Sequence, residues 1–479
     1  MINIPIIDIT EVGYVTEVKH DIIKVSGLNF CVYGQLVQFS DKTKGMIMGY
    51  TPEDVLIIAF GSSEKIVMGD EVVTLTEVLS IPVGDKYLGR VVNSLGKSID
   101  DSGDIESTTS IPIFREAPGV MERVEVVDPL LTGVKTIDMN IPIGKGQREL
   151  IIGDRRTGKS SLCLDTIINQ RDKDVICIYC WIGGSFASLK NIVYALLEKD
   201  ALDHTIILSA AANTSAGEQY LAPYAAAAIG EYFVDKGKDV FVVFDDLTKH
   251  AWMYRQISLL MERSPGREAY PGDIFYAHSS LLERAGNFRD KGTMTFFPVV
   301  EALQGDITGY IQTNIISITD GQIYLNLALF HEGFKPAIDL GLSVSRIGSK
   351  VQYKAIKEVS SGLRLEYVQY RELLSMTKLN TKLSSEAQQQ LKRGNTLCEL
   401  FIQSNNQPIS FAEEVILFYA FKRRILEALP APTVKRFKDE FFSYLTKTRP
   451  EIIGQIWSDK NLSEGIKTQL DKLLVDFFK

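Results

Sequence analysis

The chain has 479 residues, of which 45% are hydrophobic and 23% charged, and its formal net charge is −8. This composition excludes a disordered or fibrous protein and predicts about two to four domains. The acidic balance argues against a general nucleic-acid binder, because affinity for phosphate backbones comes mainly from clustered Lys and Arg. Five cysteines are too few for a disulfide scaffold of this length.

The N-terminus and the hydropathy of the chain bear on membrane association. The opening MINIPIIDITEVGYV lacks the basic region and apolar stretch of a secretory signal. No window reaches the roughly 18 uninterrupted apolar residues of a membrane span. The nearest case, Tyr220–Val234, is broken by Pro223, Gly230 and Glu231. We therefore expect any link to a membrane to come through partner subunits.

The first part of the chain consists of short β-rich runs separated by Gly, Asp, Asn and Ser. The runs are Tyr14–Val18, Ile22–Val25, Gln35–Gln38, Lys44–Tyr50, Asp54–Phe60 and Glu71–Leu75. Six short strands at this spacing predict a small β-barrel over residues 1–76.

The central part, residues 77–350, predicts a parallel sheet covered by helices on both faces, because near-continuous apolar runs alternate with helix-like stretches. The apolar runs are Glu149–Ile152, Val175–Ile182, Thr205–Ser209, Asp239–Phe244 and Thr293–Val299. Asp320-Gly321 lies between two further runs, Ile315–Thr319 and Gln322–Leu325, and predicts a hairpin.

The last part, residues 351–479, predicts a helical domain. Apolar residues recur three and four apart over Ala355–Thr377, Ala387–Ile402 and much of 410–446. The predicted fold class is therefore α/β multidomain, with a barrel, a phosphate-loop sheet domain and a helical domain.

The strongest local motif is Gly153–Ser160, GDRRTGKS, which matches G-x-x-x-x-G-K-[ST]. In such a loop the backbone N–H groups surround phosphate oxygens, Lys159 bridges the β- and γ-phosphates, and Ser160 ligates Mg²⁺. A predicted strand precedes the motif and a predicted helix, Ser161–Ile168, follows it, as a phosphate loop requires. The alternative is a glycine-rich turn without a ligand.

A second motif is the buried strand DVFVVFD, which ends at Asp245. Ligands of open α/β sheets bind at the carboxyl ends of the strands, so Asp245 is a candidate for holding Mg²⁺. The alternative is an aspartate that only caps the strand end.

A hydrolytic ATPase also needs a group that positions the attacking water, usually a carboxylate or amide. The strand end Trp181–Phe186 reads WIGGSF and has no carboxylate at Gly184. The alternative is that Asp246 supplies the base. The same strand carries Cys177 and Cys180, but residues three apart point to opposite faces, which disfavours a metal or redox role.

Taken together, the motifs resemble the alpha subunit of F-type ATP synthases, from about Glu11 to the C-terminus. The resemblance is carried by Gly153–Ser160, Tyr220–Tyr224, Phe244–Leu247, Tyr254–Leu260, Pro265–Asp273, Leu281–Ala285, Thr313–Gln322 and Ser343–Ser349. The stretches PGREAYPGD and SITDGQI are the most specific, and SVSR-x-GS favours alpha over the catalytic beta subunit.

The resemblance implies an assembly in which three alpha and three catalytic beta subunits alternate around a central gamma shaft. It implies that the alpha site binds ATP or ADP with Mg²⁺ without turning over, while catalysis occurs in beta during ion-coupled ATP synthesis or hydrolysis. The resemblance further implies a head on the cytoplasmic, matrix or stromal side of an energy-transducing membrane. The missing carboxylate at Gly184 agrees with a non-catalytic site, since beta carries its catalytic glutamate at the matching place.

The resemblance also assigns residues. Phosphate and Mg²⁺ fall to Gly153, Asp154, Arg155, Arg156, Thr157, Gly158, Lys159, Ser160 and Ser161, with Asp245 at the metal. The adenine pocket falls to Phe330, Lys335, Pro336, Gln403 and Asn405. Arg346 is implied to reach the neighbouring beta site, with Ser343 and Ser317 near that interface. A planar, permanently charged guanidinium suits a transferring phosphoryl group; the alternative for Arg346 is an ordinary interface salt bridge.

The chain departs from the family pattern at several places. Gly184-Ser185-Phe186 replaces a glutamine-lysine-arginine run, Lys335 replaces arginine, and Asn405 replaces glutamine. Met1–Thr10, which contains Pro5, predicts no long helix before the barrel, so we expect another surface or subunit to contact the peripheral stalk. These departures favour a divergent alpha, including one from an F-like ATPase motor that does not synthesise ATP.

Two other functions compete with this interpretation. A self-sufficient secretion-type hexameric ATPase needs a carboxylate near Gly184, which is absent. A ring ATPase that acts on nucleic acid prefers a basic channel or an aromatic stacking platform, which the acidic balance and the alpha-like motifs disfavour.

Overall fold

The computed structural model describes residues 10–377, 384–427 and 429–478. It divides into two compact units. The first contains residues up to Arg123, Val175–Val300 and Thr308–Ile318, and the second contains Val124–Asp174, Glu301–Ile307 and the chain from Thr319 onward. The prediction about Met1–Thr10 lies outside the described residues except at Thr10.

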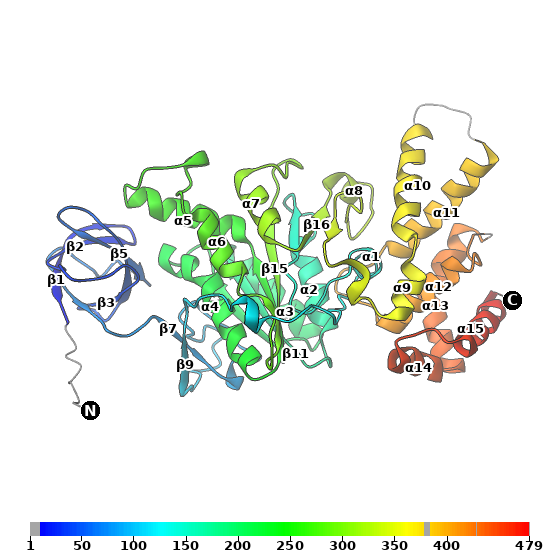
Figure 1. The fold of residues 1–479 in the computed structure, drawn as a ribbon, viewed down its shortest axis with the longest axis horizontal. Helices are drawn as coiled ribbons and strands as arrows, with labels where there is room; N and C mark the ends of the chain where they lie inside the picture. Colours follow the sequence, from blue (N-terminus) through cyan, green and yellow to red (C-terminus); the bar gives the residue numbers. More distant parts are fainter. Residues whose placement is uncertain (1–9, 378–383, 428, 479) are drawn as a thin grey trace. The chain divides into compact units, whose positions relative to one another are not determined.

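The first unit begins with a closed six-stranded antiparallel barrel, as predicted (Figure 1). The strands, in barrel order, are β1 (Val12–Lys19), β2 (Ile22–Ser26), β5 (Val55–Phe60), β4 (Lys44–Tyr50), β3 (Leu36–Phe39) and β6 (Glu71–Thr74). Val15, Ile23, Val37 and Ile57 point into a common core, since side chains alternate across each strand. An antiparallel pair, β7 (Ser80–Val83) and β9 (Thr109–Pro112), follows the barrel.

A parallel sheet forms the rest of the first unit. Its strands, in sheet order, are β15 (Thr293–Glu301), β13 (Asp239–Asp245), β11 (Val175–Ile182), β12 (Thr205–Ala210) and β8 (Val91–Val92), with β14 (Gly286–Asn287) antiparallel to β15. The helices are α3 (Phe186–Glu198), α4 (Ala216–Asp235), α5 (Leu247–Leu260), α6 (Ile274–Leu282) and α7 (Tyr310–Ile318). Helix α4 is buried almost all round and packs on β11 and β13.

In the second unit, β10 (Leu150–Gly153) pairs in parallel with β16 (Gly321–Leu325), and β17 (Val344–Ser345) pairs antiparallel with β16. The short helices are α1 (Lys135–Asn140) and α8 (Leu327–His331), and α2 (Lys159–Asn169) follows β10. The predicted helix after the motif is therefore confirmed.

The C-terminal part of the second unit is helical, as predicted. Its helices are α9 (Lys354–Ser360), α10 (Leu363–Thr377), α11 (Ser385–Phe401), α12 (Phe411–Lys422), α13 (Ala431–Thr448), α14 (Glu451–Asp459) and α15 (Glu464–Phe478). Helices α10 and α11 lie side by side (Figure 1), and a Cβ added at Gly394 would lie 2.1 Å from the Tyr370 ring, so the close approach requires glycine.

The hairpin predicted around Asp320-Gly321 is wrong. The segment before it is helix α7, and β16 pairs in parallel with β10. The apolar run misled the prediction because Ile311 and Ile315 are buried four residues apart, which is the spacing of a helix face. The helix predicted over Ala355–Thr377 is broken at Gly362, whose φ is +90°.

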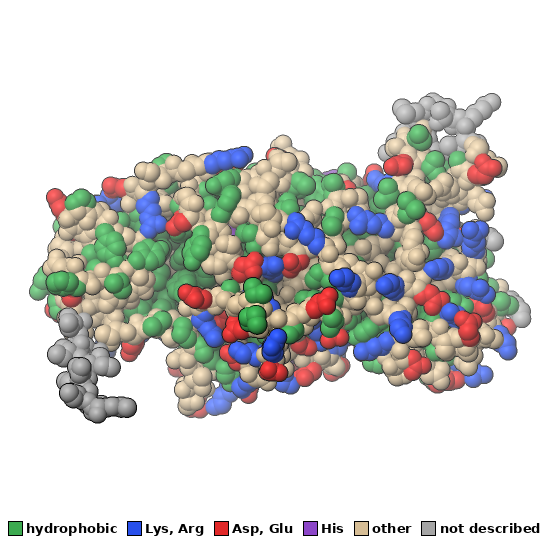
Figure 2. Space-filling model, viewed as in Figure 1, with side chains coloured by type: hydrophobic (Ala, Val, Ile, Leu, Met, Phe, Trp, Pro, Cys, Tyr) green, Lys and Arg blue, Asp and Glu red, His purple; other side chains and the backbone are tan. Residues whose placement is uncertain are grey.

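Two surface properties bear on partners. None of the helices within the described ranges combines the length and apolar character that a membrane span requires. On the face shown in Figure 2, basic and acidic side chains are interspersed. The boundaries predicted at 76/77 and 350/351 stay predictions.

Candidate functional site

The phosphate-loop motif joins strand β10 to helix α2. At Gly153, which ends the strand, an added Cβ would lie 2.6 Å from the backbone oxygen of Leu325, so no side chain fits. Gly158 has a φ of +102° and is the N-cap of α2, a conformation that L-residues with side chains rarely adopt. Both motif glycines are therefore required by the backbone itself.

The loop between these glycines is braced by its own polar groups. The Thr157 hydroxyl donates to the Asp154 backbone oxygen at 2.8 Å, and the Asp154 carboxylate accepts from the Gly305 N–H at 3.1 Å. Arg155 donates to Glu301 at 2.9 Å. The loop is thus held in one conformation by contacts to residues 301–305, which fixes the direction of its N–H groups.

The basic groups of the loop suit an anion. Lys159 is 8% exposed, and its Nζ donates to the backbone oxygens of Gly153 and Asp154 at 2.8 Å each. The first turn of α2 contains no acidic residue, and Gly158 has no side chain that could cap the first-turn N–H groups. Helix N-termini of this kind favour phosphate, so the residues present fit a nucleotide phosphate chain.

The candidate metal residue of the first unit is Asp245, at the end of β13. Its side chain is 4% exposed and accepts a hydrogen bond of 2.5 Å from the Tyr179 hydroxyl on the neighbouring strand β11. Within the described ranges, no group of three or more His, Cys, Asp or Glu side chains could hold a metal.

The carboxyl end of β11 carries no acid, as the sequence indicates. Asp246, the alternative base, is 2% exposed and caps helix α5 by accepting from the Lys249 N–H at 2.8 Å. Its second oxygen lies 3.5 Å from the Lys249 ammonium. The carboxylate of Asp246 is therefore engaged in structure, which disfavours it as a general base.

The predicted adenine-binding residues come together in the second unit. The backbone N–H of Gln403 donates to the backbone oxygen of Lys335 at 2.8 Å, and the Lys335 ammonium lies 4.6 Å from the centre of the Phe330 ring. Pro336 follows Lys335 through a cis peptide bond, and Asn405 is exposed. Four of the five predicted residues thus belong to one linked patch.

Gln403 makes more bonds than the sequence indicates. Its Nε2 donates to the backbone oxygens of Gly133 at 2.7 Å and Gln407 at 2.9 Å, and its Oε1 accepts from the Lys135 N–H at 3.2 Å. The side chain of Gln403 therefore connects the segment around 403–407 to the start of helix α1, which is a structural role independent of any ligand.

One carboxyl group couples helix α2 to the same segment. Burial raises the pKa of Asp165 to about 7, while hydrogen bonds from the backbone N–H groups of Asn406 and Gln407 oppose that rise in pKa. Its side chain is 7% exposed. The phosphate helix and the 403–407 segment are thus linked through a buried ionisable group, which sequence reasoning missed because nothing local marks it.

The three residues predicted for the beta interface differ in exposure. Arg346 is exposed, and its backbone N–H donates to the Asp320 oxygen at 2.8 Å. Ser343 is fully buried, and its hydroxyl donates to the Asp339 oxygen at 2.6 Å and accepts from the Tyr324 N–H at 2.9 Å. Ser343 thus fixes the segment that carries Arg346. Ser317, in α7 of the first unit, donates to the Asn314 oxygen at 2.7 Å.

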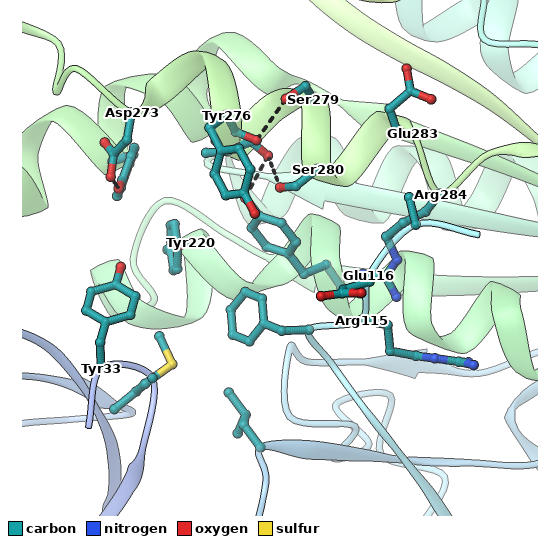
Figure 3. Close-up of a pocket in the computed structure, with 18 of the residues that line it drawn as sticks. Tyr33, Arg115, Glu116, Tyr220, Asp273, Tyr276, Ser279, Ser280, Glu283 and Arg284 are labelled. Carbon is teal, nitrogen blue, oxygen red and sulfur yellow. Dashed lines mark hydrogen bonds between the residues drawn. The ribbon is translucent and has the colours of Figure 1, made fainter. Parts of the chain in front are cut away.

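A hollow of about 800 Å³ lies elsewhere in the first unit and was not predicted. Figure 3 shows Tyr33 of the barrel on one side and Tyr220 and Tyr276 of the sheet domain on the other. The Tyr254 hydroxyl donates to Asp273 at 2.7 Å on its wall. No phosphate-loop residue lines it. Tyr220 and Tyr224 line the hollow, but in the sequence they belong only to a stretch that carries the family resemblance.

Comparison with known proteins bears on the whole chain. Residues 9–76 match the beta-barrel domain of the ATP synthase alpha/beta family, residues 133–345 its nucleotide-binding domain, and residues 352–477 its C-terminal domain. The chain belongs to the ATP synthase alpha/beta family.

Within the family, the similarity is to alpha subunits. The chain is 44% identical over 476 residues to ATP synthase subunit alpha of Clostridium kluyveri, covering 99% of this chain and 94% of the relative. It is 45% identical over 474 residues to that of Clostridium botulinum, covering 98% and 94%. The resemblance to an F-type alpha subunit and the three-part fold class are confirmed, and the chain is part of the ATP synthase enzyme complex.

Proposed function

We propose that this chain binds ATP or ADP with Mg²⁺ without hydrolysing it, and that it regulates and completes the catalytic sites of neighbouring beta subunits. The observation that carries the proposal is a contrast within the chain. The phosphate loop is complete and braced, whereas the carboxyl end of β11 has no acid and Asp246 is engaged as a helix cap.

In the proposed site, Gly153–Ser161 hold the phosphates, and Ser160 and Asp245 provide oxygen ligands for Mg²⁺. The metal supplies charge neutralisation of the phosphate oxygens when bound. Phe330, Lys335, Pro336, Gln403 and Asn405 form the adenine side. The contacts of Lys335 with Phe330 and Gln403 support a shared pocket there.

Membership of the family supports the proposed partners. In the proposal, three copies of the chain alternate with three catalytic beta subunits around a gamma shaft, and Arg346 enters the adjacent beta site. The exposed position of Arg346 and the buried hydroxyl bonds of Ser343 support a rigidly mounted, outward-facing arginine. The head lies on the cytoplasmic, matrix or stromal side of an energy-transducing membrane and contacts that membrane only through other subunits.

The test measures binding and turnover of the purified chain together. We expect stoichiometric retention of Mg-ATP in equilibrium dialysis and almost no phosphate release. Steady turnover near the typical enzyme value of ~10 s⁻¹ would refute a non-catalytic role. Absence of nucleotide binding would refute the assignment of the site.

A further inference from the structure

Arg346 directly follows strand β17, and its backbone is held by the residues that precede strand β10. The N–H of Arg346 donates to the backbone oxygen of Asp320 at 2.8 Å. Asp320 in turn donates its N–H to the backbone oxygen of Arg148 at 2.8 Å. Two successive backbone hydrogen bonds therefore lead from Arg346 to Arg148, and all three residues belong to the second unit.

The side chain of Arg148 reinforces the same connection. Its Nε and Nη2 donate to the two carboxylate oxygens of Asp320 at 3.1 and 2.9 Å, and its backbone N–H donates to Oδ2 at 3.0 Å. Bidentate arginine–carboxylate pairs fix orientation as well as distance. The two side chains are only 17% and 29% exposed. Asp320, whose backbone oxygen accepts from Arg346, is therefore held firmly in place.

The residues on either side of Arg346 are held from the same segment. Nε2 of Gln147 donates to the Ser345 hydroxyl at 3.3 Å, and that hydroxyl donates to the backbone oxygen of Pro142 at 2.8 Å. The Ser345 oxygen also accepts from the N–H of Gly348 at 3.4 Å. The backbone before Arg346 is therefore joined both to the backbone after it and to Gln147.

Glu149 packs against the strand that pairs with β17. Its side chain is fully buried, and its Oε2 accepts from Nε2 of Gln147 at 2.6 Å and would lie 2.5 Å from a Cβ added at Gly321. Burial raises the pKa of Glu149 well above its ordinary value, while the Gln147 hydrogen bond and the charge of Arg346 oppose the rise. A neutral carboxyl group is therefore favoured, which supports the strand without holding the Arg346 guanidinium in an internal ion pair.

We propose that Gln147, Arg148 and Glu149 are positioning residues that aim Arg346 at the catalytic site of the neighbouring beta subunit. This inference rests on the proposed role of Arg346. The three residues act through their bonds to the backbone that carries the guanidinium, without touching the substrate. A displacement of about 1 Å near a reacting group can cost roughly 10²-fold in rate, so a weaker support lowers turnover even when Arg346 is present.

The first test is a double-mutant cycle in the assembled complex. We expect Arg148→Ala to lower kcat for ATP hydrolysis about 10- to 100-fold with KM unchanged, and to have almost no further effect when Arg346→Ala is also present. Arg148→Lys keeps the charge without the planar fork and should recover only part of the rate. Arg423→Ala is the control, because Arg423 forms a comparable bidentate pair with Asp471 between α12 and α15.

The possible results separate the two proposals. Equal fold losses for Arg148→Ala in the two backgrounds would overturn the positioning role, because the effect would not depend on Arg346. An unchanged kcat in Arg148→Ala would overturn it as well, while leaving the role of Arg346 intact. A loss below about tenfold for Arg346→Ala alone would overturn the proposed role of Arg346, and this inference with it.

The second test keeps the proposal falsifiable if Arg148→Ala prevents assembly. Glu149→Gln replaces a neutral carboxyl group by an amide of the same size, and we expect kcat to stay within about twofold. Glu149→Ala removes the support next to Gly321, and we expect a loss of about tenfold that disappears in the Arg346→Ala background. Unchanged kcat in Glu149→Ala, or a loss that persists in that background, would contradict the inference.

Discussion

The phosphate loop keeps the full G-x-x-x-x-G-K-[ST] pattern, whereas the carboxyl end of β11 carries no acidic residue. In the loop, Gly158 has a positive φ, Gly153 lies too close to the Leu325 backbone for a side chain, and hydrogen bonds from Thr157 and to Asp154 brace the segment between them. The strand end reads WIGG over residues 181–184 and contains neither a carboxylate nor an amide side chain.

The difference shows that binding and hydrolysis are physically separable. Phosphate binding depends on backbone N–H groups and one ammonium, whose placement is a property of the fold. Hydrolysis depends on one side chain that orders water, and its loss leaves the backbone unchanged. A chain can therefore lose turnover through a few substitutions while keeping a complete nucleotide site.

The largest expected effect concerns Arg346, which is proposed to act in the catalytic site of a neighbouring beta subunit and not in the nucleotide site of this chain. We expect Arg346→Ala to lower turnover of the assembled complex at saturating ATP by about 10³–10⁵, the contribution of arginine fingers. Nucleotide retention by this chain should be unchanged. Arg346→Lys keeps the charge without the planar fork and should recover only part of the rate. A loss below about tenfold would indicate a structural salt bridge.

The next prediction tests the loop directly. Lys159→Ala removes the ammonium expected to pair with phosphate oxygens, so we expect affinity for Mg-ATP to fall about a hundredfold. Equilibrium dialysis of the purified chain measures it. Lys447→Ala, at an exposed position of α13, is the matched control. Unchanged nucleotide occupancy in the Lys159 variant would contradict the proposal that the phosphate loop binds the nucleotide.

Much of the fold was predictable because it is encoded locally. The six barrel strands and the buried parallel strands follow from short-range apolar patterns, and the motif located the loop between β10 and α2. Helix α7 was mistaken for a strand because a short apolar run does not distinguish the two.

The sequence predicted the candidate site only at positions that belong to a recognisable motif, such as the phosphate loop. A Cβ added at Gly184 would lie 2.0 Å from the ring of Trp181, and the orientation of that ring is a matter of packing that no spacing rule reveals. The same holds for Gln403, two of whose three side-chain bonds join segments about 270 residues apart in sequence, and for the hollow near Tyr33.

The third prediction concerns pH and the helix that follows the loop. The pKa of Asp165 is raised to about 7 in the folded chain by burial, against an ordinary value of 3.8. Between these values the folded state binds a proton that the unfolded state does not, so stability falls as pH rises from about 4 to 7.

Asp165 alone should contribute a loss of about 3–4 kcal/mol across this window, measured as the free energy of urea unfolding at several pH values. Asp165→Asn should remove this contribution and leave the part of the slope that comes from other buried carboxyl groups with a raised pKa, such as Glu149 and Glu414. Asp172→Asn, at an exposed position, should leave it in place. A slope that is the same in the Asp165 variant would show that this carboxyl group is already ionised at pH 5.

The smallest effect distinguishes structural from ligand-binding residues on the adenine side. Gln403→Ala leaves the backbone oxygens of Gly133 and Gln407 and the N–H of Lys135 without their side-chain partner. Because the site is half-buried, water replaces part of the loss, and we expect about 1–2 kcal/mol less stability in urea unfolding. Asn405→Ala, at an exposed position, should change stability by under about 0.5 kcal/mol. If the two variants have the same free energy of unfolding and differ only in nucleotide affinity, Gln403 contributes to ligand binding and not to stability. The structural bracing would then be limited to the phosphate loop.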